Sequence, residues 1–130
     1  MSREEQVVLA ELPGDGELAD YPVFENCGAQ ALLRFVFNRD GAAWRGGLRF
    51  DGVSACRFRA KAYCALWHVE QAYDSLVEVR ESKWIAELRA DEDPEQQRWG
   101  MRHFMVYLDS AGCYEIVAMS SAWLPEERES

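Results

Sequence analysis

The sequence predicts an α+β fold built mainly from antiparallel β-sheet, as one sheet or a two-sheet sandwich, with one or two short helices. Two β-rich arms flank a turn within residues 102–120, strand–turn patterns recur over residues 31–60, and residues 83–90 have helical spacing. No linker, repeat or low-complexity tract divides the 130 residues, and 48% of them are hydrophobic. We therefore expect residues 1–130 to form a single globular domain.

The β-hairpin over residues 102–120 is the central element of this prediction. Both arms are rich in β-branched and aromatic residues, which favour strands. The expected register pairs Asp109 with Cys113 and so places Tyr107 opposite Glu115 on a mixed face. The other face is wholly apolar and must be buried. Its members are Phe104, Val106, Leu108, Tyr114, Ile116 and Ala118.

The N-terminal part of the chain contains one short run that could form a strand, Val7–Ala10. The turn-forming residues 13–16 then end any regular element. Residues 17–28 are expected to form an ordered loop, in which Val23 and Phe24 contact the core.

Three strands are predicted to follow as an antiparallel meander. Residues 31–38 form the first, and residues 48–50 and 53–60 form the next two on either side of the turn Asp51-Gly52. In the third strand, alternation directs Cys56 and Phe58 inward and Arg57 and Arg59 outward.

Residues 62–73 are ambiguous and predict a short helix or an irregular crossover. Residues 76–80 then predict a strand, and Ser82 is the expected N-cap of a helix over residues 83–90. Trp67 and Trp84 are interpreted as anchors at the edge of the core. Near the C-terminus, we expect residues 123–124 to dock on the domain and the acidic tail from Pro125 to fray.

The net charge of −9 is unevenly distributed along the chain. Residues 34–61 contain seven basic and two acidic side chains, which give +5, so the remainder sums to −14. The acidic excess disfavours nucleic acid and membrane surfaces and favours a basic protein partner. The arginine-rich segment could still form a nucleic-acid surface, or nearby carboxylates could neutralise it.

Four cysteines, at positions 27, 56, 64 and 113, lack the C-x-x-C spacing of many metal sites. The first residues lack the basic and apolar pattern of a signal peptide, so we expect a cytoplasmic protein with free thiols. No run is long and apolar enough to span a membrane. The sequence has no Gly-rich phosphate loop, no H-E-x-x-H zinc-protease motif, no G-x-S-x-G motif and no EF-hand loop, and no cofactor is expected.

Two groups of polar residues could carry chemistry. The first is His103, Tyr107 and Glu115 on the mixed face of the hairpin, where a carboxylate could tune a histidine for acid–base work. The alternative is a cross-strand Tyr–Glu hydrogen bond with a satisfied histidine. The second group is His68, Glu70 and Asp74, a candidate metal site whose alternative is a loop histidine beside solvated carboxylates.

The segments Tyr73–Val79 with Ser82-Lys83-Trp84, and His103–Asp109 with Cys113–Ala118, resemble parts of small uncharacterised bacterial proteins. The resemblance covers the C-terminal half, from about Val53, and implies a compact cytoplasmic domain without assigned catalytic residues.

No motif identifies the function. Besides nucleic-acid binding through the arginine-rich segment, two classes of protein are considered. The favoured class is a non-catalytic protein that binds a partner protein, with a toxin-neutralising immunity protein as one example. The alternative is a small enzyme or ligand-binding domain that uses the mixed face of the hairpin. An exposed strand edge at Val7–Ala10 or Leu76–Arg80 would also allow a homodimer.

Overall fold

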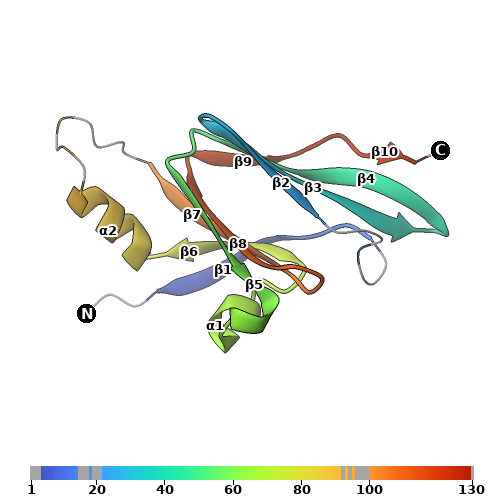
Figure 1. Cartoon of the computed structure of the whole chain (residues 1–130), viewed down its shortest axis with the longest axis horizontal. Helices are drawn as coiled ribbons and strands as arrows, with labels where there is room; N and C mark the ends of the chain where they lie inside the picture. Colours follow the sequence, from blue (N-terminus) through green and yellow to red (C-terminus); the bar gives the residue numbers. More distant parts are fainter. Residues whose placement is uncertain are drawn as a thin grey trace.

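The computed structural model describes residues 4–14, 18, 22–91, 93, 95 and 100–129, which form two five-stranded antiparallel sheets and short helices (Figure 1). The first sheet has the order β1-β6-β7-β8-β5. Its strands are β1 (Glu5–Glu11), β6 (Ser75–Arg80), β7 (Arg102–Leu108), β8 (Gly112–Ala118) and β5 (Ala55–Ala60). The expected α+β class with a two-sheet sandwich is confirmed.

The second sheet has the order β10-β4-β3-β2, and β9 also pairs with β4. Its strands are β2 (Val23–Cys27), β3 (Gln30–Arg39), β4 (Ala42–Asp51), β9 (Ser120–Trp123) and β10 (Glu127–Arg128). Two expectations were wrong here. Val23 and Phe24 belong to a strand rather than a loop, and the tail after Pro125 returns to the sheet as β10, where Glu127 pairs with Arg45.

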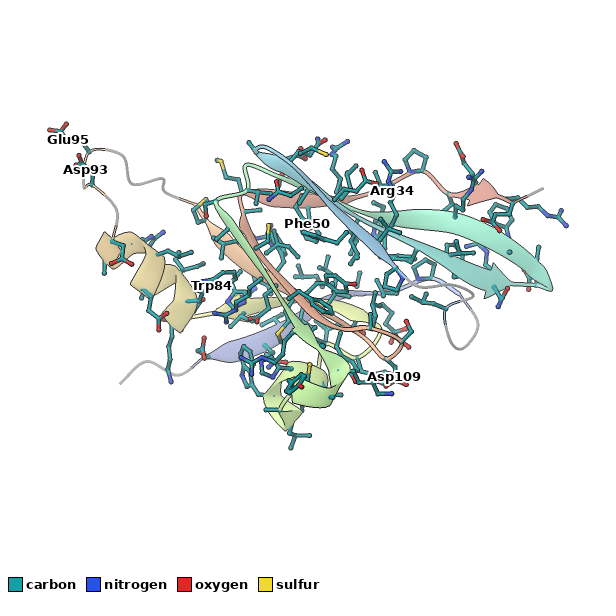
Figure 2. All side chains as sticks on the ribbon, in the orientation of Figure 1. Arg34, Phe50, Trp84, Asp93, Glu95 and Asp109 are labelled. Carbon is teal, nitrogen blue, oxygen red and sulfur yellow. The ribbon has the colours of Figure 1, made fainter. Side chains whose placement is uncertain are left out.

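The first sheet is the middle layer of the molecule. One of its faces packs on the second sheet, and Phe50 lies between the sheets with its ring 5.5 Å from that of Phe104 (Figure 2). The opposite face is covered by three short helices, η1 (Lys61–Tyr63), α1 (Leu66–Val69) and α2 (Lys83–Asp91) (Figure 1). No helix among the described residues is long and apolar enough to cross a membrane.

The apolar face predicted for the central hairpin is buried between the sheets as expected. The predicted register was wrong by two residues, because Leu108 pairs with Gly112 and Tyr107 pairs with Cys113 rather than facing Glu115. Gly112 is therefore a strand residue, not a turn residue. Its φ of +148° and the closeness of the Arg59 carbonyl oxygen both require glycine.

The predicted meander holds for β3 and β4 but not for β5. After the turn at Asp51-Gly52 the chain leaves the second sheet, and β5 pairs with β8 in the first. Phe58 lies on the inner face beside Tyr114, as expected, but it is 52% exposed because β5 is an edge strand and one side of the ring has no neighbouring strand. Leu76–Arg80 is not an edge, because β6 lies between β1 and β7.

Strand β4 runs through Gly46-Gly47, whereas the predicted strand began only at residue 48. The Leu124 amide donates a hydrogen bond to the Gly47 carbonyl oxygen (2.9 Å), and the Leu124 side chain lies against the glycine. A Cβ at position 47 would overlap the carbonyl oxygen of Leu33 on β3. Glycine is therefore needed for β3, β4 and the C-terminal segment to approach one another.

We predict that Gly47→Ala destabilises the protein by about 3 kcal/mol, because the neighbour that must move is backbone rather than a flexible side chain. Chemical denaturation followed by tryptophan fluorescence would measure the change. Gly28→Ala is the control, since a Cβ there meets nothing within 4 Å and only the φ of +70° is unfavourable, at about 1 kcal/mol. Equal losses in the two variants would contradict the packing argument.

Candidate functional site

The polar residues of the candidate site lie on the helix-covered face of the first sheet. Cross-strand pairing places Met105 of β7, Glu115 of β8 and Arg57 of β5 in one row. His103, two residues before Met105, is the diagonal neighbour of Glu115 on the same face. The sheet register thus brings His103 and Arg57 to Glu115 from opposite sides.

Glu115 is bound by both neighbours at short distances. His103 Nε2 lies 2.8 Å from Glu115 Oε1, while Arg57 Nε and Nη2 donate to Oε2 and Oε1 at 2.8 and 3.0 Å. The side chains of His103 and Glu115 are 0% and 2% exposed, whereas that of Arg57 is 44% exposed. The bidentate arginine therefore connects a buried carboxylate to the surface.

Ser82 links this pair to helix α2. Its Oγ lies 2.8 Å from His103 Nδ1 and accepts a hydrogen bond from the Ile85 amide at 3.1 Å, which confirms the predicted N-cap. An ionised Glu115 can only accept hydrogen bonds, so in the neutral imidazole Nε2 carries the hydrogen. Nδ1 then accepts the Ser82 hydroxyl, and every polar atom of the ring has a partner.

Trp84, in the first turn of α2, covers Arg57 and His103 on the helix side of the sheet. Its ring lies 4.0 Å from the Arg57 Cζ and meets the His103 ring edge to face, with centroids 5.2 Å apart. Figure 2 shows Trp84 on the side of α2 that faces the sheet. The stack on Arg57 is a cation–π contact that joins α2 to the Glu115–Arg57 pair.

The electrostatics of the site favour an ionised Glu115. Burial by itself raises the pKa of Glu115, but the hydrogen bonds and positive charge supplied by His103 and Arg57 outweigh it and hold the pKa at about 2. The carboxylate is therefore charged at neutral pH, and the bidentate arginine balances that charge.

The arrangement is suited to holding α2 on the sheet rather than to acting on a substrate. The histidine has no exposed side-chain surface, and its two ring nitrogens are occupied by Ser82 and Glu115. A surface hollow of about 560 Å³ between β6 and α2 reaches Ser82, but neither His103 nor Glu115 lines it. A general acid or base must reach the group that it protonates, and this geometry offers no such contact.

Tyr107 is separate from the pair that it was predicted to join. The tyrosine is buried with Cys113 and Ala72 on the α1 side of the hairpin, and burial raises its pKa. Its hydroxyl lies 3.4 Å from Asp109 Oδ1, a long hydrogen bond. The structure therefore brings together His103 and Glu115 of the predicted trio and places Tyr107 elsewhere.

The candidate metal residues do not converge either. His68 is buried, and its Nδ1 accepts the Ala65 amide hydrogen at 2.9 Å, while Glu70 is exposed at the end of α1. Asp74 lies in the following turn with φ +49°. Burial, followed by the charge of Arg59, lowers the pKa of His68. Within the described residues, no group of three His, Cys, Asp or Glu side chains could hold a metal ion.

The arginine-rich segment is largely neutralised by carboxylates, all but one of which come from other parts of the chain. Six of its seven cations form ion pairs. The pairs are Arg34–Glu25, Arg39–Glu126, Arg45 with Glu127 and Glu129, Arg49–Asp51, Arg57–Glu115 and Lys61–Asp109. A nucleic-acid surface needs cations that are free to contact phosphates, and these pairs reduce their number.

The sequence did not predict that Arg57, Ser82 and Trp84 join His103 and Glu115 in one polar network. Ser82 was interpreted only as a helix cap, Trp84 only as an anchor, and Arg57 only as an outward residue. Alternation places Arg57 on one face of a strand, but the pairing of β5 with β8 is needed to connect it to Glu115. That pairing spans 58 residues and has no local signal.

Searches against protein-family models, curated proteins and solved structures found no match to this chain. The resemblance to small bacterial proteins therefore stays a prediction, and the site must be interpreted from its own geometry.

We predict that Glu115 makes stability depend on pH in the acid range. Its pKa falls from an ordinary 4.5 to about 2 on folding, so its contribution is complete above pH 4.5 and is lost as the pH falls toward 2. The full effect corresponds to about 3 kcal/mol. Urea denaturation at several pH values should show that Glu115→Gln flattens this part of the curve, and parallel curves for variant and wild type would contradict the assignment.

We also predict that Ser82→Ala destabilises the protein by about 2 kcal/mol, because it removes the cap of α2 and leaves His103 Nδ1 unpaired in a buried place. Ser82→Thr keeps a hydroxyl at the same position and should recover most of the loss. Thermal unfolding would measure both variants. If alanine and threonine behave alike, the hydroxyl does not link α2 to the sheet.

Proposed function

We propose that this protein binds a partner protein that presents a basic surface, and that it does so in the cytoplasm without catalysing a reaction. The observation that carries the proposal is the distribution of charge after ion pairing. Because every arginine of residues 34–61 except Arg59 is paired with a carboxylate, these side chains do little to offset the acidic surplus elsewhere on the surface.

The surplus is concentrated on and just beyond α2. Residues 81–95 contain six acidic and two basic side chains, a net charge of −4. Those of Glu81, Glu87, Asp91, Asp93 and Glu95 are exposed. Such a surface steers a basic protein toward it and increases the association rate at low salt. An acidic protein that neutralises a basic toxin, as an immunity protein does, is one function of this type.

The closed polar network supports a binding role in a second way. The buried contacts from Glu115 to Ser82 and Trp84 fix α2 to the sheet before any partner arrives. A pre-ordered helix loses little conformational freedom on binding, which favours affinity.

The alternative function, a small enzyme or ligand-binding domain that uses the mixed face of the hairpin, has less support. It needs His103, Tyr107 and Glu115 to share an accessible cavity. In the described residues the first and last are buried beneath α2, and Tyr107 is buried on the α1 side.

We predict that charge reversal on α2 abolishes partner capture. The double variant Glu87→Lys/Asp91→Lys should lose a basic host protein that the wild type retains at physiological salt, since the attraction is electrostatic. Affinity capture followed by mass spectrometry would identify that protein, and purified material would give the dissociation constants.

The matched control is Glu127→Lys/Glu129→Lys on and beside β10, which changes the net charge equally at a different surface. It should retain the partner. Equal loss in both variants would mean that total charge rather than α2 matters. No difference between the α2 variant and wild type, or capture that is insensitive to salt, would overturn the proposed surface.

A further inference from the structure

We propose that the free edge of β5 is a docking site for an extended segment of the partner, which joins the first sheet as an additional strand and places one carboxylate over Arg59. The inference rests on the proposed function, because it names a contact made by the same kind of partner. It concerns a different surface from the acidic side of α2.

The outward amides of β5 are available for pairing, while the outward Ala60 carbonyl oxygen accepts a weak hydrogen bond from Cys64 Sγ at 3.5 Å. The Lys61 amide donates to the Ala111 carbonyl oxygen of the β7–β8 turn at 3.0 Å. Because N–H groups alternate along a strand, those of Arg57 and Arg59 face β8, and those of Phe58 and Ala60 point away from the sheet. No backbone group of the described residues pairs with these outward amides.

The two edges of the first sheet differ in how they are protected. β1, at the far edge, has a register shift between Val8 and Ala10, an irregularity that disfavours the addition of another strand. β5 pairs with β8 through six consecutive residues without a shift and contains no proline. A regular, open edge is the geometry that peptide-binding domains use when they add a strand.

The surface beside this edge has exposed apolar side chains, and one of them is held by a neighbour. The ring of Phe58 is half exposed and lies 4.7 Å from that of Tyr114. β5 leads directly into the η1–α1 segment (Figure 1), where Tyr63 and Leu66 are each 76% exposed. Exposed apolar groups next to unpaired backbone groups favour a protein contact over open solvent.

The charges on β5 specify the chemistry of the added strand. Arg57, Arg59 and Lys61 alternate along one side of the segment, and Glu115 and Asp109 neutralise the first and third. The Arg59 guanidinium instead donates a long hydrogen bond of 3.4 Å to the Tyr63 carbonyl oxygen and has no carboxylate partner among the described residues. One acidic side chain on the added strand would provide the carboxylate partner that Arg59 lacks.

A second copy of this chain fits the edge poorly. An antiparallel pair of β5 strands about a two-fold axis sets residues of the same face opposite one another. Three registers overlap the two β5 strands near their middles. In one, Arg57 faces Arg59 of the other copy. In the other two, Arg59 or Arg57 faces the same residue of the other copy. Like charges directly opposite are destabilising, so the edge disfavours self-pairing and favours an acidic segment.

The test uses the full chain, labelled with nitrogen-15, and two acetylated and amidated peptides in which valine alternates with threonine. One peptide has glutamate at its central polar position and the other has lysine. We predict that the glutamate peptide shifts the amide resonances of Phe58 and Ala60, slows their hydrogen exchange, and binds about twofold to fivefold more tightly than the lysine peptide. Arg59→Glu should reverse this preference.

Ala60→Pro provides a variant that blocks the edge without disturbing the fold. Ala60 has φ −61° and ψ 149°, which suit proline, and the amide that it loses points outward. The variant should unfold like the wild type and lose peptide binding. The proposal is overturned if millimolar glutamate peptide leaves the β5 amides unchanged, if lysine peptide binds equally, or if Ala60→Pro binds normally. Because these peptides do not probe α2, failure here leaves the charge-reversal experiment as a separate test of the proposed function.

Discussion

The buried carboxylate of Glu115 is the interaction on which the outer layer of the molecule depends. It lies on β8, receives Arg57 from β5 and His103 from β7, and through His103 it is connected to Ser82 at the start of α2. A charge in this place would be strongly unfavourable if a partner were missing. The strands and the helix must therefore assemble in one arrangement, which makes this network a determinant of geometry more than a source of net stability.

The first sheet separates two kinds of packing. Its inner face meets the second sheet through apolar side chains, where no directional bonds are needed. Its outer face is divided between the apolar cluster beneath α1 and the polar network beneath α2. α2 has no fully buried residue, so its own apolar contacts hold it less firmly than those of a core helix would. The hydrogen bonds at Ser82 and the stacking of Trp84 on Arg57 compensate for this.

The apolar pattern of the sequence was enough to predict the class of fold and the two faces of the hairpin, but not its register. A shift of two residues leaves every side chain on the same face, so alternation cannot distinguish the observed pairing from the expected one. The expected register treated Gly112 as part of the turn, whereas contact with Arg59 of β5 requires glycine within the strand. Similarly, Asp51-Gly52 identified a turn, but only tertiary packing decides which sheet receives the next strand. Pairs distant in sequence, such as Arg57–Glu115, follow from that choice and could not be predicted before it.

The same topology determines where function can lie. His103 and Glu115, two of the predicted catalytic residues, have almost no exposed side-chain surface, since the sheet and α2 cover them from both sides. Binding to another molecule must use exposed charges or hydrogen-bonding groups that have no partner within the fold. On the described surface these include the carboxylates of α2, the outward amides of β5 and the cation of Arg59. Arg59 is the exception in a segment whose other basic residues form ion pairs with carboxylates. Because exposed ion pairs contribute little to stability, the fold loses almost nothing when Arg59 lacks one, and its cation stays available to the carboxylate of a partner.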